Sequence, residues 1–304
     1  MQTSFFLSER TANDIDSRVA KVLRDVGITE PPLSLADVRH LLELDLNWYS
    51  SADEGILKET IHRMTVAGKQ ILARPCILLD AVRKFSLKAL WQPDRKRILL
   101  DRNEPKLKHR WNEAHEIGHS LLDWHEPYSH GDHKQTLSYS CHHQIEAEAN
   151  YAAGRLLFLR ERFTEELFSS PITFAAVQSL SKSFGNTMTS CLWRTIESIE
   201  TPCFAMVSRH PREPSQNNDE PVRYFIRSRQ FARQFDGIKA SQVFGTLATF
   251  CRSGGGPIGE AEMALTNDNG ALQLFLAQSF HNGHDTLTLA MPVGVREPAV
   301  ALVK

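Results

Sequence analysis

The chain has 304 residues, enough to bury a substantial core and to form about two domains. Hydrophobic residues make up 41% and charged residues 23% of it, the composition of an ordinary soluble globular protein. Its 35 Lys and Arg nearly cancel its 36 Asp and Glu, which excludes a global attraction toward nucleic acid or anionic lipid.

The N-terminal stretch MQTSFFLSERTANDIDSR reaches acidic residues too early for a secretory signal. No apolar run approaches the ~18–20 residues that a membrane span needs. The five scattered cysteines lack the pattern of a disulfide framework. We therefore expect a cytoplasmic protein without a membrane partner.

Helical patterns dominate the first two thirds of the chain. Residues 13–28 and 31–46 have the apolar spacing of two amphipathic helices. LKALWQ and RKRILLD flank a turn-prone PDR and predict a β-hairpin. Further helices are expected from about His109 and from about Ile145, and residues 172–199 predict a helix, a Gly-Asn turn and a second helix.

The pattern changes after Thr201 and Pro202. CFAMV, VRYFI, LQLFLA and TLTLAM predict strands, so we expect an α+β fold with a helix-rich N-terminal part. The segment SGGGPIGE satisfies G-x-G-x-x-G, but Pro257 interrupts it and no βαβ unit surrounds it. It predicts a flexible loop and not a nucleotide site.

The segment AHEIGHSLLDWHEPYSHGDH carries the strongest chemical signal, because His115, Glu116 and His119 form the pattern H-E-x-x-H. On a helix the two histidines lie one turn apart and can both bind one tetrahedral ion. Glu116 projects about 100° round the helix, where it can take a proton from a metal-bound water. Gly118 is costly inside a helix, and we expect another backbone to approach closely there.

Zinc needs a third protein ligand, and two residues compete for that role. Glu146 would complete a His₂Glu site from the next helix, where Asn150 lies on the same face and could orient a ligand imidazole. His125 has the metzincin spacing after His119, but Leu122 stands where that pattern has glycine. We favour Glu146, with His125 in reserve, and expect Glu148 to point away from the site.

The residue that stabilises the oxyanion is left open by the sequence. The candidates are the neighbouring polar rings, namely His130, His133, His142, His143, Tyr139 and Tyr151. Cys141 is most simply an ordinary small side chain.

RWNEAHEIGHSLLDWH, followed by EAEANYAAGRLLF, resembles the ImmA/IrrE family of bacterial metallopeptidases. The match is specific over about residues 95–160. It departs from the family at Tyr151-Ala152, which concerns packing and not ligands. The resemblance implies zinc on His115, His119 and Glu146, with Glu116 as the base, in a gluzincin-like metalloendopeptidase.

The resemblance also implies a cytoplasmic regulatory peptidase that cuts a DNA-binding transcriptional repressor in a response to stress or DNA damage. We expect a zincin-like domain over residues 1–165, a helix-turn-helix-like segment over 166–201, and an α+β sensor domain over 202–304 that is similar to GAF domains. The substrate is then expected to be a helix-turn-helix repressor.

Two alternatives compete with a repressor-cutting peptidase. The first is a zinc-containing module that captures a partner without cutting it, which would need the ligands but not Glu116. The second is a DNA-binding regulator. Residues 171–200 contain two cations, Lys182 and Arg194, and two anions, Glu197 and Glu200. The segment is therefore neutral and has few cations to neutralise DNA phosphates. An extended substrate could pair with an exposed edge strand, for which we expect Arg97–Asp101.

Overall fold

The structure is a computed structural model and describes residues 2–3, 6–50, 89–126, 139–213 and 220–293. Contacts divide the chain into two compact units. The N-terminal unit comprises Leu7–Phe163 with Ser183–Thr187, and the C-terminal unit comprises Met1–Phe6, Thr164–Lys182 and Met188–Lys304. Within the described ranges, none of the helices combines the length and hydropathy of a membrane span.

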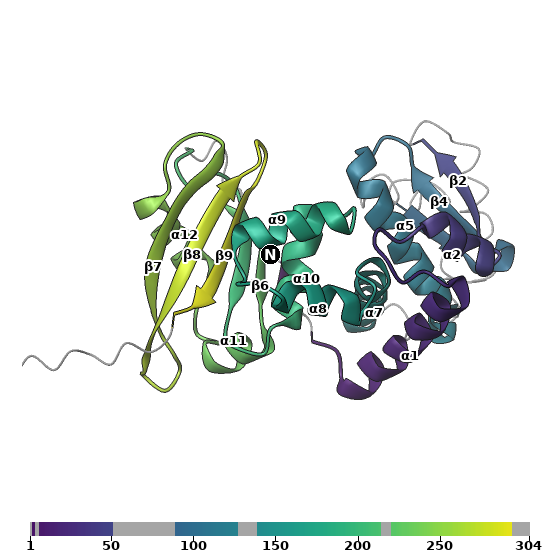
Figure 1. Ribbon diagram of the computed structural model, residues 1–304, viewed down its shortest axis with the longest axis horizontal. Coiled ribbons are helices and arrows are strands. Elements are labelled where there is room, and N and C mark those ends of the chain that lie inside the picture. The colour runs from purple at the N-terminus through teal and green to yellow at the C-terminus, as the bar shows by residue number, and fades with distance from the viewer. Residues whose placement is uncertain (1, 4–5, 51–88, 127–138, 214–219, 294–304) are drawn as a thin grey trace, which may run out of the picture. The chain divides into compact units, whose positions relative to one another are not determined.

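The N-terminal unit combines helices with a small sheet, and α5 packs against β3 and β4 of that sheet (Figure 1). Its elements are α1 (Glu9–Val26), α2 (Leu35–Leu41), β2 (Asp45–Tyr49), β3 (Ala89–Gln92), β4 (Arg97–Asp101), α5 (Lys106–Leu121) and α7 (Tyr139–Leu157), with short 3-10 turns η1 (Pro93–Arg95) and η2 (Asp123–His125). Helix α8 (Glu161–Phe168) crosses the border of the two units. The predicted hairpin is present as β3 and β4.

The order of the small sheet is β2-β4-β3, with β2 parallel and β3 antiparallel to β4. The prediction that Arg97–Asp101 forms an edge strand is wrong, because this strand pairs on both sides. Among the described residues, β3 is an edge of the sheet, and this edge runs beside α5. The strand order depends on the pairing with β2, which begins at Asp45, at the end of the segment expected to be helical, and for which no strand was predicted.

Two expected helix boundaries also differ from the structure. The second helix ends at Leu41, because Glu43 takes a left-handed conformation (φ 55°) and the chain then extends into β2. Helix α7 begins at Tyr139, six residues before the expected Ile145. Helix ends fray, so a boundary is the least sharply defined part of a helix.

Helices cover both faces of the sheet in the C-terminal unit, whose order is β1-β6-β5-β9-β8-β7. Its elements are β1 (Gln2–Thr3), α9 (Phe174–Ser183), α10 (Met188–Ser198), β5 (Phe204–Ser208), β6 (Val222–Arg227), α11 (Arg229–Gln234), α12 (Ala240–Phe250), β7 (Gly256–Thr266), β8 (Leu272–His281) and β9 (Thr286–Pro292). Phe225 packs toward α11 and α12, while its neighbour Tyr224 contacts Trp193 of α10. Phe174 of α9 stacks on Phe280 at a centroid distance of 5.3 Å.

The expected flexible loop at SGGGPIGE is wrong, since β7 begins at Gly256 inside it. Gly256 takes a positive φ of 80°, and a Cβ on Gly259 would lie 2.9 Å from the carbonyl oxygen of Phe250. The glycines therefore allow the strand to pass close to the end of α12. Glycines are typical both of flexible loops and of strands that pack closely against another backbone, so the sequence pattern alone does not distinguish the two.

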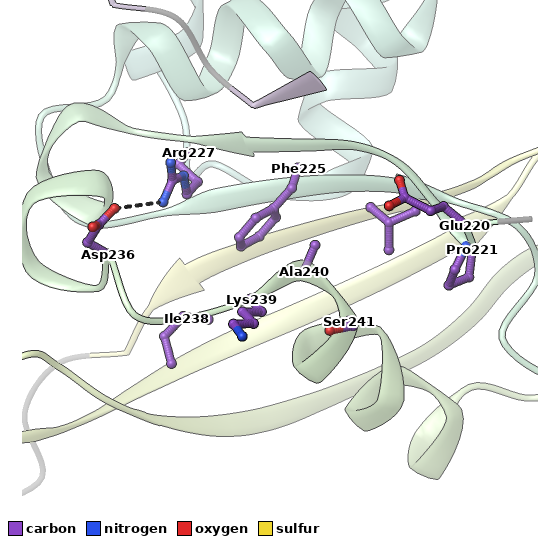
Figure 2. A pocket seen from close by; sticks show the side chains of 10 residues that line it. Glu220, Pro221, Phe225, Arg227, Asp236, Ile238, Lys239, Ala240 and Ser241 are labelled. Carbon is purple, nitrogen blue, oxygen red and sulfur yellow. Dashed lines mark ion pairs between the residues drawn. The ribbon is translucent and has the colours of Figure 1, made fainter. Parts of the chain in front are cut away.

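A cavity of about 400 Å³ opens between β6 and the start of α12 (Figure 2). Its base is apolar, and Arg227 and Asp236 form an ion pair at its edge with Nη1 and Oδ1 3.6 Å apart. The side chains that line it are Glu220, Pro221, Val222, Phe225, Arg227, Asp236, Ile238, Lys239, Ala240 and Ser241.

The α+β fold class, with a helix-rich domain that carries a small sheet, is confirmed. The division into residues 1–165, 166–201 and 202–304 stays a prediction. In the structure α10 packs on β5 and β6, so this part of the helical segment belongs to the same compact unit as the strands that follow it.

Helices α5 and α7 pack closely at Gly118, as the costly glycine indicated. A Cβ on this residue would lie 2.7 Å from the carbonyl oxygen of Ala149 and 3.3 Å from the Cβ of Ala152. A backbone oxygen cannot move aside by changing rotamer, so any side chain at this position pushes the two helices apart.

We expect Gly118→Ala to lower the free energy of unfolding by about 1–3 kcal/mol, because overpacking outweighs the ~1 kcal/mol that alanine gains over glycine in a helix. Gly154→Ala in α7 is the matched control, since no atom lies within 4 Å of its Cβ position. That change should raise stability by ~0.5–1 kcal/mol. Urea unfolding followed by circular dichroism measures both, and equal stability of the two variants would contradict the close approach.

Candidate metal centre

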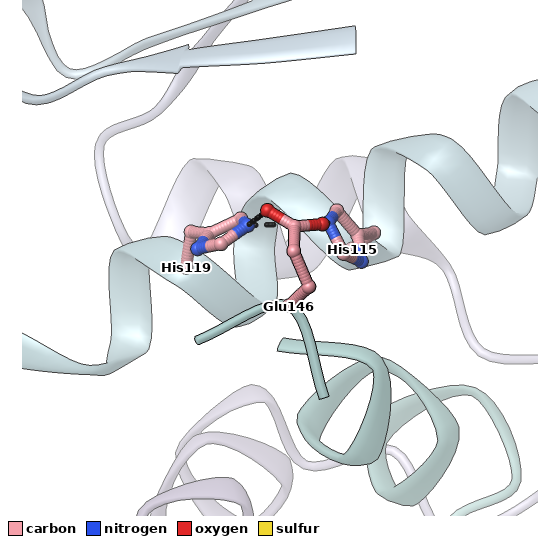
Figure 3. A group of neighbouring side chains, drawn as sticks. All are labelled: His115, His119 and Glu146. Atoms are coloured by element: carbon pink, nitrogen blue, oxygen red, sulfur yellow. Dashed lines mark hydrogen bonds and ion pairs between the residues drawn. The ribbon is translucent and has the colours of Figure 1, made fainter. Parts of the chain in front are cut away.

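Three side chains from α5 and α7 converge on one point (Figure 3). The Nε2 atoms of His115 and His119 lie 3.1 Å apart; Oε2 of Glu146 lies 3.3 Å from the first and Oε1 of Glu146 lies 3.7 Å from the second. Zn–N bonds of ~2.0–2.1 Å at tetrahedral angles separate neighbouring ligand atoms by about 3.3 Å. The three donor atoms therefore fit one tetrahedral ion, with its fourth position left for water or substrate.

Local sequence explains why the three donors face one another. His115 and His119 are one helical turn apart on α5, while Ala114 and Ile117 turn into the core and are fully buried. On α7, the backbone of Ala149 packs against Gly118. This contact sets the position of Glu146, one turn earlier on α7, relative to the two imidazoles. The three residues that the sequence singled out as ligands are brought together, and that they bind zinc stays a prediction.

His115 is oriented by a hydrogen bond from its second ring nitrogen. Its Nδ1 lies 3.1 Å from Oδ1 of Asn150, the contact expected from the spacing on α7. With Asn150 presenting its carbonyl oxygen, Nδ1 carries the proton and donates it, so the lone pair of Nε2 is directed at the ligand cluster.

His125, the reserve candidate for the third ligand, takes a different place. It is fully buried in η2, and its Nδ1 lies 2.9 Å from Nδ1 of His119, on the side of that ring away from the ligand cluster. Its Nε2 lies 2.9 Å from Oε2 of Glu148. The structure therefore places His125 behind His119 and not among the three converging donors.

Glu148 points away from the ligand cluster, as expected, but it is only 2% exposed. Its carboxylate accepts hydrogen bonds from Nε1 of Trp124 at 2.7 Å and from Nε2 of Gln144 at 2.9 Å, besides its contact with His125. Burial acts to raise the pKa of Glu148, but these hydrogen bonds hold the pKa below its usual value. Sequence reasoning assigned no role to Glu148; the only local signal was an acidic residue directly before the buried Ala149.

Glu116 is buried beside the ligand cluster, with 6% of its surface exposed. Burial raises the pKa of its carboxyl to about 7, His115 acts to lower that pKa, and the charge of Glu146 adds to the rise. The backbone N–H of Trp91 in β3 donates a hydrogen bond to the carboxyl. The edge strand thus fixes the group that the sequence predicts as the base, and a pKa near neutrality suits general base catalysis.

The candidates for oxyanion stabilisation find no support among the described contacts. Tyr151 donates to Oδ2 of Asp16 at 3.3 Å, and His143 is exposed. His130 and His133 lie outside the described residues, as do the side chains of Tyr139, Cys141 and His142. Tyr49, which the sequence did not single out, is buried at the end of β2. Burial and the charges of Asp101 and Glu116 raise its pKa.

A helix-borne H-E-x-x-H with a glutamate from a second helix defines a metallopeptidase-like protein. Residues 76–190 match the sequence profile of the IrrE N-terminal-like domain, Peptidase_M78, and the chain carries a domain of this family. The fold is similar to a Mycobacterium tuberculosis transcriptional regulator with a TM-score of 0.52 and 13% identity, and the match covers 95% of this chain and 96% of the other. At this identity the likeness concerns the fold alone. The comparison with curated proteins gave no match.

We expect His115→Ala, His119→Ala and Glu146→Ala each to weaken metal binding strongly, because each removes one of three converging donors. Metal analysis of the purified wild-type chain should give about one zinc per molecule. Full occupancy in Glu146→Ala together with lost occupancy in His125→Ala would transfer the third ligand position to His125.

Proposed function

We propose that the protein is a zinc-dependent regulatory endopeptidase that cleaves a DNA-binding transcriptional repressor in a stress or DNA-damage response. The observation that carries the proposal is the buried carboxyl of Glu116 beside His115, His119 and Glu146. Three converging donors would hold an ion without a base, whereas hydrolysis also needs a group that moves a proton. The Peptidase_M78 match supports the same reaction class.

The donor set favours zinc. Two imidazoles and one carboxylate in tetrahedral spacing are the ligands that catalytic zinc takes, with one position left open. Bound there, zinc would lower the pKa of a water and polarise the scissile carbonyl.

The protein's own groups would move the proton and position the substrate. Glu116 would take the proton of the attacking water and pass it to the leaving amine. The hydrogen bond from the Trp91 N–H would hold this carboxyl in place during the transfer. An extended substrate segment would pair with β3, which is an edge strand among the residues that the structure describes and lies beside α5, in place of the central strand β4.

A repressor is the proposed substrate because the family resemblance implies one. A protein described as a transcriptional regulator shares the fold over nearly the whole chain, which supports a regulatory role for this chain and does not bear on its substrate. For the C-terminal unit, the proposed regulatory role rests on the family resemblance.

A role as a DNA reader is disfavoured by the packing of the helical segment. Arg194, one of its two cations, is only 6% exposed and lies 3.5 Å from Glu197. Leu192 and Ile196 of α10 are also fully buried. A DNA-recognition helix exposes the side chains that enter the major groove, whereas α10 packs against β5 and β6 of the sheet.

Glu116→Gln tests the proposal, because it preserves shape and removes the base. We expect cleavage of the repressor to fall by about 10²–10⁴-fold, the usual contribution of general acid–base catalysis. Zinc content and folding should remain close to wild type. The measurement is co-expression with a candidate repressor from an adjacent gene, followed by gel analysis of fragments and a repression reporter.

Glu113→Gln is the matched control, since Glu113 lies on the same helix but pairs with Arg39, Oε1 to Nε at 2.6 Å. It should leave cleavage intact. If Glu116→Gln relieves repression as well as the wild type does, with no fragments in either case, the protein captures its partner without cutting it.

A further inference from the structure

His119 is the first residue of a chain of hydrogen bonds that runs away from the metal centre. Its Nδ1 lies 2.9 Å from Nδ1 of His125, whose Nε2 lies 2.9 Å from Oε2 of Glu148. His125 is fully buried and Glu148 is 2% exposed, so water does not compete for these contacts. We call His119, His125 and Glu148 the relay.

The partners of Glu148 fix where the protons of the relay lie. Its two oxygens face donors from Trp124, Gln144 and His125, which is the pattern of an ionised, accepting carboxylate. Nε2 of His125 is therefore a donor. In a neutral imidazole the other nitrogen is then an acceptor, so Nδ1 of His125 accepts the proton that Nδ1 of His119 donates.

This arrangement leaves the lone pair of the His119 Nε2 directed at His115 and Glu146, as metal binding requires. We propose that Glu148, acting through His125, is a positioning residue for the metal ligand His119. The pair fixes the tautomer and ring orientation of His119 and increases its strength as a ligand. The inference rests on the metal centre of the proposed function and identifies what tunes that centre.

The two ligand histidines are then unequal. His115 donates to the neutral amide of Asn150, whereas His119 is connected to a full negative charge through His125. A carboxylate behind a ligand imidazole increases the basicity of that imidazole, and loss of such a partner typically costs 10–100-fold in metal affinity. His119 is therefore the stronger of the two nitrogen ligands.

Arg18 of α1 holds the segment that carries His125 in position. Nη1 of Arg18 donates to the carbonyl oxygen of Leu121 at 2.9 Å and to Oδ2 of Asp123 at 3.0 Å. The guanidinium of Arg18 also lies over the ring of Trp124, 5.0 Å from its centroid. These contacts hold η2 against the end of α5, which keeps the imidazole of His125 behind that of His119.

The test measures Co²⁺ binding by the full-length chain, because the visible absorption of Co²⁺ reports both affinity and ligand geometry. Competition with a chelator gives the dissociation constant for each variant. Circular dichroism of the metal-free proteins shows which variants fold.

Three variants remove different parts of the relay. Glu148→Gln keeps the shape and removes the charge, so Co²⁺ affinity should fall by roughly 10–100-fold with an altered spectrum. His125→Phe removes both nitrogens and should have an effect at least as large. His125→Asn keeps an acceptor for the Nδ1–H of His119, so it should restore part of the affinity that His125→Phe loses.

Gln144→Ala is the matched control, because it removes a hydrogen bond to Oε1 of Glu148 that lies outside the relay. It should bind Co²⁺ nearly as the wild type does, with an unchanged spectrum. The proposal is overturned if folded Glu148→Gln keeps wild-type affinity and spectrum, or if Gln144→Ala loses as much affinity as Glu148→Gln. Glu148→Gln provides the test even where His125→Phe does not fold.

These outcomes are distinct from failure of the proposed function. A wild-type chain that binds Co²⁺ and shows the variant effects, but cuts no repressor, supports the relay and contradicts the peptidase. A wild-type chain that cuts a repressor while Glu148→Gln binds Co²⁺ normally contradicts the relay alone. A wild-type chain that binds no Co²⁺ contradicts both.

Discussion

The contact between α5 and α7 at Gly118 determines the geometry of the metal centre. The donors come from two helices, and their separation depends on how closely the helix backbones approach. Because Gly118 has no side chain, the carbonyl oxygen of Ala149 can lie 2.7 Å from the position that a Cβ would occupy. Glu146 is one turn from Ala149, so a change in helix spacing at the glycine would move the carboxylate relative to both imidazoles. The packing of the two helices therefore also determines the geometry of the metal ligands.

Much of the centre could be predicted because helix geometry is local. The spacing of His115 and His119 fixes their common direction once the segment is helical, and Ala114 and Ile117 identify the opposite, buried face. Gly118 also indicated the close backbone approach that the structure contains. The α+β class and the strands after Thr201 followed from patterns of the same local kind.

The parts that could not be predicted depend on contacts between distant segments. His125 had metzincin spacing, and only the fold places it behind His119. Glu148 was expected only to point away from the site, and the donors around it come from η2 and from its own helix. The strand over Gly256 and Gly259 resembled a loop, because glycines are also typical of loops and the sequence alone does not show that this strand passes close to the end of α12. The central position of β4 likewise depends on its pairing with β2, which ends 40 residues before β3 begins.

The buried contact between His125 and Glu148 has a consequence for how this protein changes over evolutionary time. Loss of the histidine alone leaves an ionised carboxylate in the interior without one of its donors, and loss of the carboxylate alone leaves an imidazole N–H without an acceptor. Either single step is disfavoured, whereas replacement of both by apolar residues of similar volume leaves no unpaired charge in the interior, although Nδ1 of His119 and Nε1 of Trp124 then lose their acceptors. Among homologous chains, positions 125 and 148 should therefore covary, and lineages that lost the pair should carry apolar residues at both.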